Sequence, residues 1–175
     1  AYRLWPIREG QVHFQEETQY PHLSGFVPSE DRIWQLYTGE TFALGFCAPG
    51  QTEELYQIPL PTDSFCPAFS GDGQKVAFRR MQPRKSQQEQ LLEVYDVASG
   101  ELVHQLSLGV KWANAGALSL SHDGTWLAAL IGFHVMLWHV PTGQQVMPDD
   151  ASHTEHTSGV GFACDDTTLV SSGWD

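Results

Sequence analysis

A glycine-centred turn recurs along this chain at a nearly regular spacing. It reads Glu-Gly-Gln, Pro-Gly-Gln, Ser-Gly-Glu and Thr-Gly-Gln around Gly10, Gly50, Gly100 and Gly143. Successive glycines are separated by 40, 50 and 43 residues. Apolar runs of strand length stand between these turns, and a repeat of this length indicates stacked β units. The sequence therefore predicts an all-β protein built from one repeated unit.

The stretch from Ala117 to Gly143 is the clearest copy of the unit. Its first strand ends in the turn Ser121–Gly124, where Asp and Gly favour tight backbone conformations. A nearly continuous apolar run, Trp126–Ile131, predicts a strand that is covered on both faces. A third run, Val135–Val140, leads into the glycine turn. A fourth strand after that turn completes a four-stranded antiparallel unit.

Matching the other segments to this copy sets the expected boundaries. A second marker, the apolar residue that ends each first strand, recurs at Phe26, Phe69, Leu120 and Phe162. We expect a half-unit over 1–15, complete units over 20–60, 64–107 and 116–149, and a half-unit over 153–175. An alternative phase would match Gly39 to Gly143, but it leaves 61 residues for the unit that follows. The first phase is therefore preferred.

Composition restricts the classes of partner. The chain has 9 Lys and Arg against 21 Asp and Glu, a formal net charge of −12. Nucleic-acid phosphates and anionic membranes would repel such a chain, so we expect neither as a partner. No apolar run approaches membrane-spanning length. Three cysteines form no disulfide framework, which favours a reducing compartment, and we expect a cytoplasmic location.

Patterns typical of catalysis are not found in the sequence. It has no serine in a G-x-S-x-G turn and no glycine-rich phosphate loop. The segment His153–His156 has metal-ligating residue types at close spacing, but it lies in an expected loop and lacks a specified third ligand. Cys164 stands beside two aspartates, which suppress thiolate formation. We therefore expect no enzymatic activity, no cofactor and no metal.

Two motifs resemble those of the WD40-repeat family. The first is F-S-x-D-G at Phe69–Gly73, and the second is W-x-x-x-T-G at Trp138–Gly143. The resemblance implies a β-propeller of four-stranded antiparallel blades, here about three full blades plus a half-blade at each end. It also implies a structural hydrogen-bonded tetrad, to which His153, Ser172 and Asp175 correspond in the last unit. The residues at the blade tryptophan position are Trp5, Tyr95 and Trp138.

The same resemblance implies a protein–protein interaction scaffold without catalytic function. We expect the chain to be a fragment of a larger propeller. A closed four-bladed ring, in which Tyr2–Gln15 supplies the last two strands, is the alternative architecture. The alternative function is a regulatory or sensor propeller domain of a larger multidomain enzyme, such as a bacterial protein kinase or protease.

Basic residues gather in one part of this acidic chain. Five of the nine Lys and Arg residues fall within eleven positions: Lys75, Arg79, Arg80, Arg84 and Lys85. The last two belong to Met81–Gln90, a polar insertion that predicts a hairpin loop. One interpretation is a solvated loop that resists aggregation. The other is a binding site for an acidic segment of a protein partner, formed by Arg79, Arg80, Arg84 and Lys85.

Overall fold

The computed structural model describes residues 2–4, 7–8, 11–12, 16–18, 24–26, 33–37, 42–48, 54–61, 64–81, 90–108, 115–146, 152–163 and 165–175. The regular secondary structure in these ranges consists of β-strands, which pair antiparallel in two- and four-stranded sheets. The predicted all-β class is confirmed. No helix that could cross a membrane occurs in these ranges. The chain divides into two compact units, Ala1–Thr62 and Asp63–Asp175.

The first unit begins with two short antiparallel pairs. Strand β1 (Tyr2–Leu4) pairs with β4 (Glu16–Thr18), and β2 (Ile7–Arg8) pairs with β3 (Gln11–Val12). We expect from the sequence that the N-terminal half-unit ends at Gln15. In the structure the strand pairing continues to Thr18 of β4, which lies opposite Tyr2 of β1.

A four-stranded sheet follows in the first unit. It consists of β5 (Ser24–Phe26), β6 (Ile33–Tyr37), β7 (Phe42–Cys47) and β8 (Glu54–Leu60), in that order. Trp34 lies within β6, the second strand, opposite Phe46 of β7. The alternative repeat phase is therefore wrong, because it requires Trp34 in a third strand.

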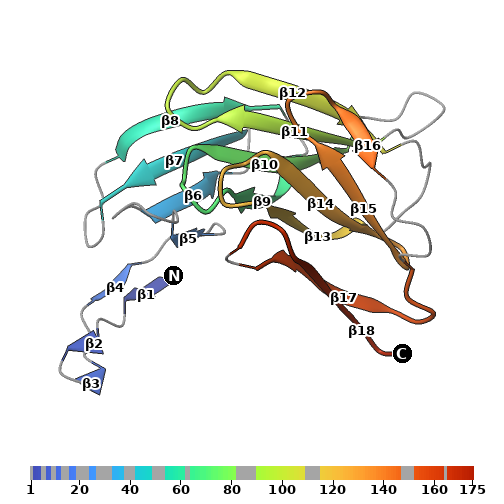
Figure 1. Ribbon diagram of the computed structural model, residues 1–175. Coiled ribbons are helices and arrows are strands. Elements are labelled where there is room, and N and C mark those ends of the chain that lie inside the picture. Colours follow the sequence, from blue (N-terminus) through green and yellow to red (C-terminus); the bar gives the residue numbers. More distant parts are fainter. Residues whose placement is uncertain are drawn as a thin grey trace. The chain divides into compact units, whose positions relative to one another are not determined.

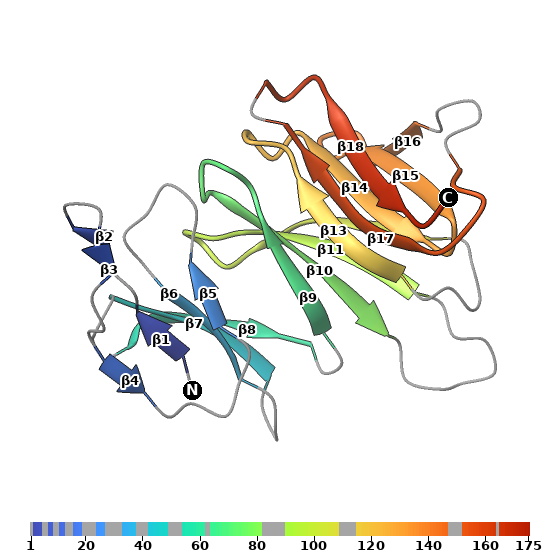
Figure 2. The same ribbon diagram turned by 90° about the horizontal axis from the view of Figure 1, so that it is seen from below.

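The second unit contains three successive sheets (Figure 1). The first is β9 (Ser64–Phe69), β10 (Lys75–Met81), β11 (Gln90–Asp96) and β12 (Leu102–Ser107). The second is β13 (Ala115–Leu120), β14 (Trp126–Ile131), β15 (His134–His139) and β16 (Gln144–Val146). The last is the pair β17 (Thr157–Phe162) and β18 (Leu169–Gly173). Strand β13 lies against β9 and β17, so the first strands of the three sheets are neighbours (Figure 2).

The glycine turns join third to fourth strands, as the repeat phase predicts. Gly100 lies between β11 and β12, and Gly143 lies between β15 and β16. Their φ angles are +70° and +66°, in the left-handed region where a Cβ atom is unfavourable. Gly50 falls between β7 and β8 in sequence, outside the described residues.

The main apolar core of the second unit lies between its two four-stranded sheets. Leu92 and Val94 of β11 pack with Leu127 of β14 and with Met136 and Trp138 of β15. Trp138 is 2% exposed. Alternation along each strand sends these side chains to one face, which explains why apolar residues two apart share the cluster.

Candidate functional site

In two sheets, the turn between the first and second strands contains the same hydrogen bond, from a serine hydroxyl to an aspartate carboxylate. Ser70 Oγ donates to Asp72 Oδ1 at 2.6 Å, and Ser121 Oγ donates to Asp123 Oδ1 at 2.7 Å. The Thr125 hydroxyl and the Thr125 backbone N–H also donate to the Asp123 carboxylate. These bonds lower the pKa of Asp123 to about 2. The motif that resembles WD40 repeats is therefore a locally bonded turn.

Contacts between neighbouring turns tie the three sheets of the second unit together at one end. The Asp72 backbone N–H donates to the His122 carbonyl oxygen at 2.8 Å. The His122 N–H in turn donates to the Asp166 carboxylate. Lys75 Nζ donates to the Asp123 carbonyl at 2.9 Å. At this end of the second unit, hydrogen bonds therefore link the turns of neighbouring sheets to one another.

A hydrogen-bonded chain of three side chains lies at the other end, beside β17 and β18. His153 Nδ1 contacts Asp175 Oδ1 at 2.8 Å, and His153 Nε2 contacts Ser171 Oγ at 2.9 Å. Thr154 donates its backbone N–H to Asp175 Oδ2 at 2.7 Å, and its hydroxyl lies 3.2 Å from the same oxygen. The Thr154 N–H and then His153 lower the pKa of Asp175 to about 2. The ionised carboxylate therefore accepts from Nδ1–H, and the other ring nitrogen, Nε2, shares a hydrogen bond with the Ser171 hydroxyl.

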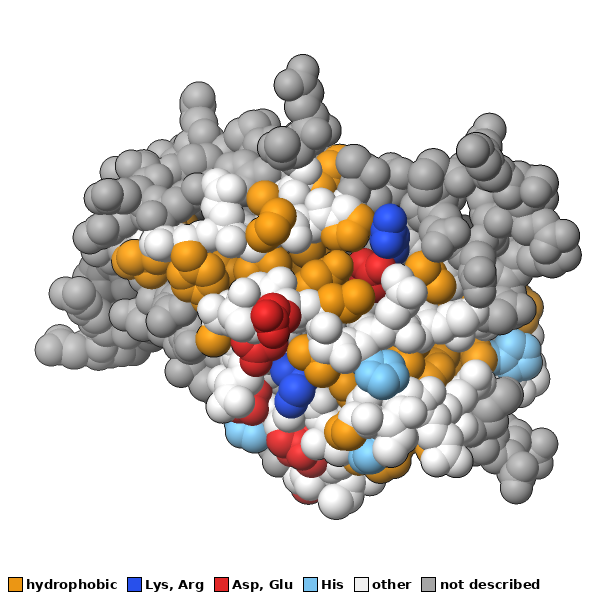
Figure 3. Space-filling model, turned by 90° about the horizontal axis from the view of Figure 1, so that it is seen from above, with side chains coloured by type: hydrophobic (Ala, Val, Ile, Leu, Met, Phe, Trp, Pro, Cys, Tyr) orange, Lys and Arg blue, Asp and Glu red, His pale blue; other side chains and the backbone are white. Residues whose placement is uncertain are grey.

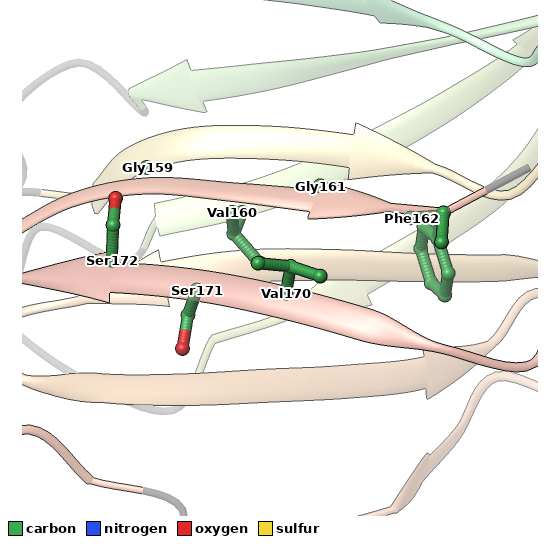
Figure 4. A pocket seen from close by; sticks show the side chains of 8 residues that line it. Gly159, Val160, Gly161, Phe162, Val170, Ser171 and Ser172 are labelled. Carbon is green, nitrogen blue, oxygen red and sulfur yellow. The ribbon is translucent and has the colours of Figure 1, made fainter.

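The sequence-based assignment named Ser172 for this chain, and the structure places Ser171 there instead. The two side chains point to opposite sides of β18 (Figure 4). Ser172 Oγ contacts Ser158 Oγ at 2.9 Å on the other face. A register shift between Thr157 and Gly159 changes which residues of β17 and β18 face each other. Two adjacent serines cannot be told apart from sequence, because strand alternation is set by this pairing.

Ser-His-Asp is also the order of a hydrolase triad, which raises the question of catalysis. Ser171 is half-buried in the middle of a paired strand, opposite Val160. It does not sit on the sharp turn that presents a nucleophile to substrate in a G-x-S-x-G motif. The arrangement joins the loop at His153 to Asp175, 22 residues away.

One face of the β17–β18 pair is open. A hollow of about 300 Å³ is lined by Gly159–Ala163 and Val170–Ser172 (Figure 4). Gly161 leaves space there, since no atom lies within 4 Å of where its Cβ would be. Val170, opposite Gly161, is 57% exposed. The lining of this hollow is partly apolar.

The residues at the blade tryptophan position differ in their surroundings. Trp138 lies in the core, whereas Tyr95 lies on a polar cluster, and Trp5 falls outside the described residues. The Tyr95 hydroxyl donates to Glu93 Oε2 at 2.9 Å. Glu93 Oε1 accepts from Arg80 Nη1 at 3.0 Å and from Gln105 Nε2 at 2.8 Å. Burial, with a further contribution from Glu93, raises the pKa of Tyr95, so the phenol remains a donor.

Of the four predicted basic residues, the structure describes two, Arg79 and Arg80, and it places them on different faces. Arg79 and Arg80 are adjacent in β10, so their side chains point to opposite faces of the sheet. Arg80 is bound to the buried carboxylate of Glu93. Arg84 and Lys85 lie outside the described residues. On the face shown in Figure 3, described Lys and Arg side chains form only small isolated patches.

The described residues contain no group of three or more His, Cys, Asp or Glu side chains arranged to hold a metal ion. In the segment His153–His156, the two histidines have different partners. His153 is part of the hydrogen-bonded chain, and His156 Nδ1 contacts the Thr157 carbonyl at 2.9 Å. The hydrogen bonds of the two histidine rings therefore give them no common partner among the described residues.

Comparisons with known proteins define the fold but no family. No protein-family model matches the chain, and no curated protein sequence matches it. Among solved structures, "Kuenenia stuttgartiensis Hydrazine Synthase" is similar with a TM-score of 0.60 at 14% identity, over 83% of this chain and 47% of that one. "Complex of KlAtg21 with coiled-coil of AgAtg16" is similar with a TM-score of 0.67 at 13% identity, over 98% of this chain and 56% of that one.

The chain thus spans about half the length of the solved structures it matches. At these identities the similarity is one of fold alone. One structure is named as an enzyme and the other as a complex with a coiled coil, so their names point to different functional classes.

Proposed function

We propose that this chain is part of a WD40-type β-propeller that serves as a non-catalytic protein-interaction platform. Three features support the proposal: four-stranded antiparallel sheets that follow one another along the chain, the shared Ser–Asp turn, and a His–Ser–Asp chain beside the last strand pair. Each sheet alone has an apolar face to bury, and stacking of successive sheets buries it.

The observation that carries the platform role is a frame of hydrogen-bonded turns whose loops present exposed side chains. At one end, turn 71–73, His122 and Asp166 are bonded to one another. At the other end, the β14–β15 turn carries Phe133, 49% exposed, and the loop before β17 carries exposed Glu155 and His156. A rigid frame that presents exposed loops at one end is typical of binding proteins.

The proposed ligand is an acidic segment of a partner protein that binds at Arg84 and Lys85. Arg80 is occupied by Glu93, so it serves to hold β10 to β11 and β12 and is not available to a partner. The connection between β10 and β11 contains both Arg84 and Lys85 in sequence. Two cations in an otherwise acidic chain attract an anionic partner locally.

The test is binding of a glutamate-rich peptide, measured by fluorescence anisotropy at low and at physiological salt. The double variant Arg84→Glu with Lys85→Glu should weaken binding and remove most of its salt dependence. The matched control, Arg3→Glu with Arg8→Glu, makes the same change in net charge at strands β1 and β2. Unchanged affinity in the first variant, or equal losses in both, would overturn the acidic-partner proposal.

A further inference from the structure

Strand β12 forms the outer edge of its four-stranded sheet (Figure 1). It pairs with β11 on one side, and no strand among the described residues pairs with its other side. The Leu108 N–H donates to the Gln90 carbonyl at 3.1 Å. Antiparallel bonds of this kind recur at every second residue, so His104 and Leu106 bond to β11 as well. The backbone N–H and C=O of Gln105, which lies between them, therefore point away from the sheet.

This edge lacks the features that usually keep an edge strand from pairing, which are proline, very short length and charged side chains. The four-stranded sheets of the described residues have β8, β12 and β16 as their outer strands. Strand β8 contains Pro59 and β16 has three residues, whereas β12 has six residues and contains no proline, Lys, Arg, Asp or Glu. Strand β12 is therefore a template on which a further strand can form.

Two adjacent apolar side chains are exposed at the start of this edge. Leu102 is 47% exposed and Val103 is 44% exposed. Pairing with β11 passes from His104 to Leu102 and leaves Val103 without an opposite residue, which makes a bulge. The edge thus combines unpaired backbone groups with apolar surface.

Contacts within the second unit hold β12 in place. Gln105 Nε2 donates to Oε1 of the buried Glu93 at 2.8 Å. The His104 ring lies against Gly143 of the next sheet, where an added Cβ would overlap it. Leu106 belongs to the main core. A ligand would therefore meet a preformed edge, which lowers the entropy cost of binding.

Beside the exposed apolar pair stands the carboxylate of Glu101. Its side chain is exposed, directly before Leu102, and the ion pairs of the described residues do not include it. On the other side of the turn, the Ser99 N–H lowers the pKa of Asp96, and Lys75 adds a compensating positive charge there. Glu101 therefore attracts a basic residue of a ligand that lies along β12, and it repels an acidic one.

We propose that β12 is a second interaction surface, which binds an extended segment of a partner protein as a fifth strand of the sheet. The segment supplies backbone hydrogen bonds to Gln105, apolar side chains against Leu102 and Val103, and a Lys or Arg beside Glu101. A second copy of this chain fits less well, because it has a net charge of −12 and its own β12 brings no basic residue. The proposal rests on the platform role but not on the basic residues between β10 and β11.

The test uses a peptide of alternating valine and threonine that ends in two lysines, and the same peptide N-methylated throughout its alternating part. N-methylation removes the N–H groups that would bond to β12 and keeps the side chains. Binding to the full chain is measured by fluorescence anisotropy at neutral pH. The unmodified peptide should bind at least about tenfold more tightly, as expected for two or more backbone hydrogen bonds. Equal affinities would overturn strand addition.

Leu102→Ser and Val103→Ser should each weaken binding of the unmodified peptide about threefold to fivefold, because nearly half of each side chain is available for burial. Glu101→Gln should weaken it about twofold. The matched control is Val146→Ser, at a residue 39% exposed on the outer strand β16, and it should leave the affinity unchanged. Equal losses in Val103→Ser and Val146→Ser would overturn the site.

Amide hydrogen exchange followed by NMR locates the added strand without any substitution. In the free chain the Gln105 N–H should exchange faster than those of His104 and Leu106, which bond to β11. The peptide at about ten times its Kd should slow exchange at Gln105 about tenfold. Unchanged exchange at Gln105 would overturn the proposal.

Two further measurements separate this surface from its alternatives. A free chain that is dimeric by light scattering and becomes monomeric in Val103→Ser would show a second copy on β12 and overturn the partner segment. The glutamate-rich peptide tests the platform role separately, because its proposed site at Arg84 and Lys85 does not involve β12. If it binds the unmodified chain and the valine–threonine peptide does not, the β12 proposal fails and the platform role stands.

Discussion

His153 and Asp175 are 22 positions apart and meet through a 2.8 Å contact between Nδ1 and Oδ1. This contact joins the loop that enters β17 to the second residue after β18. With Ser171 on the other ring nitrogen, one histidine bonds both to β18 and to the segment that follows it. The same loop bonds to the preceding sheet, since the His153 N–H donates to the Phe133 carbonyl at 2.8 Å. His153 therefore links β18, the segment after it and the preceding sheet through hydrogen bonds.

We predict that Ser171→Ala destabilises the protein more than Ser172→Ala. Removal of the Ser171 hydroxyl leaves His153 Nε2 part-buried without its partner, a loss of about 1 kcal/mol in the free energy of unfolding. Ser172 is exposed and bonds only to Ser158 among the described contacts, so its loss should change the free energy by less than about 0.5 kcal/mol. Urea unfolding of both variants measures the difference. The reverse order would contradict the assignment of Ser171.

A second prediction concerns stability in acid. The pKa values of Asp123 and Asp175 are lowered to about 2, below the ordinary value near 4. A carboxylate with a depressed pKa stabilises the fold fully above its unfolded pKa, and this contribution disappears as the pH falls through the folded pKa. Unfolding followed by tryptophan fluorescence should therefore show stability declining between about pH 4 and pH 2.

The Thr125 side chain provides the control for this acid prediction. It is the first contributor to the low pKa of Asp123. Thr125→Val should raise the pKa of Asp123 towards its ordinary value, as measured by NMR titration, and should shift part of the stability loss to higher pH. An unchanged Asp123 titration in this variant would show that the hydroxyl bond is not the cause.

Gly143→Ala should be strongly destabilising. The residue has a φ of +66°, and an added Cβ would overlap the ring of His104 on β12. The left-handed conformation alone is unfavourable for alanine by roughly 1–2 kcal/mol. Gly161→Ala is the control, because nothing lies within 4 Å of the added atom. Thermal melts should separate the two variants, and adding His104→Ala should recover the part due to overlap but not the part due to φ.

A last prediction addresses the buried carboxylate of Glu93. Glu93→Gln removes the charge that Arg80, Tyr95 and Gln105 bind, while it keeps the size of the side chain. We expect a loss of roughly 1–3 kcal/mol in the free energy of unfolding, because Arg80 loses its ionic partner and an amide cannot accept all three bonds. Glu101→Gln, at an exposed position, should change it by less than about 0.5 kcal/mol.

A double-mutant cycle with Tyr95→Phe tests whether the Glu93 cluster acts as a unit. The phenol is a donor only to Glu93 among the contacts described. The two substitutions should therefore be non-additive, with a coupling energy of at least about 0.5 kcal/mol. Additive losses would mean that the Tyr95 hydroxyl contributes independently of the carboxylate.

The sequence by itself determined the strands and the phase of the repeat. Local signals carried both: glycine turns such as that at Gly143, the bonded turn Ser121–Gly124, and apolar runs such as Trp126–Ile131, each of which became a turn or a strand where expected. Such features depend on φ preferences and on side-chain bonds within a few residues, so a short stretch of chain is enough to specify them.

Tertiary structure alone decided which face each side chain occupies and what it meets there. Ser171 faces His153, and Ser172 faces away toward Ser158, because adjacent residues of a strand point to opposite faces and the pairing of β18 with β17 fixes which face is which. Arg80 appeared to be a free cation in sequence, yet it is bound by the buried Glu93, whose partners come from three strands. These outcomes depend on pairing between distant segments, where a shift of one residue reverses every side chain, and no local pattern encodes that choice.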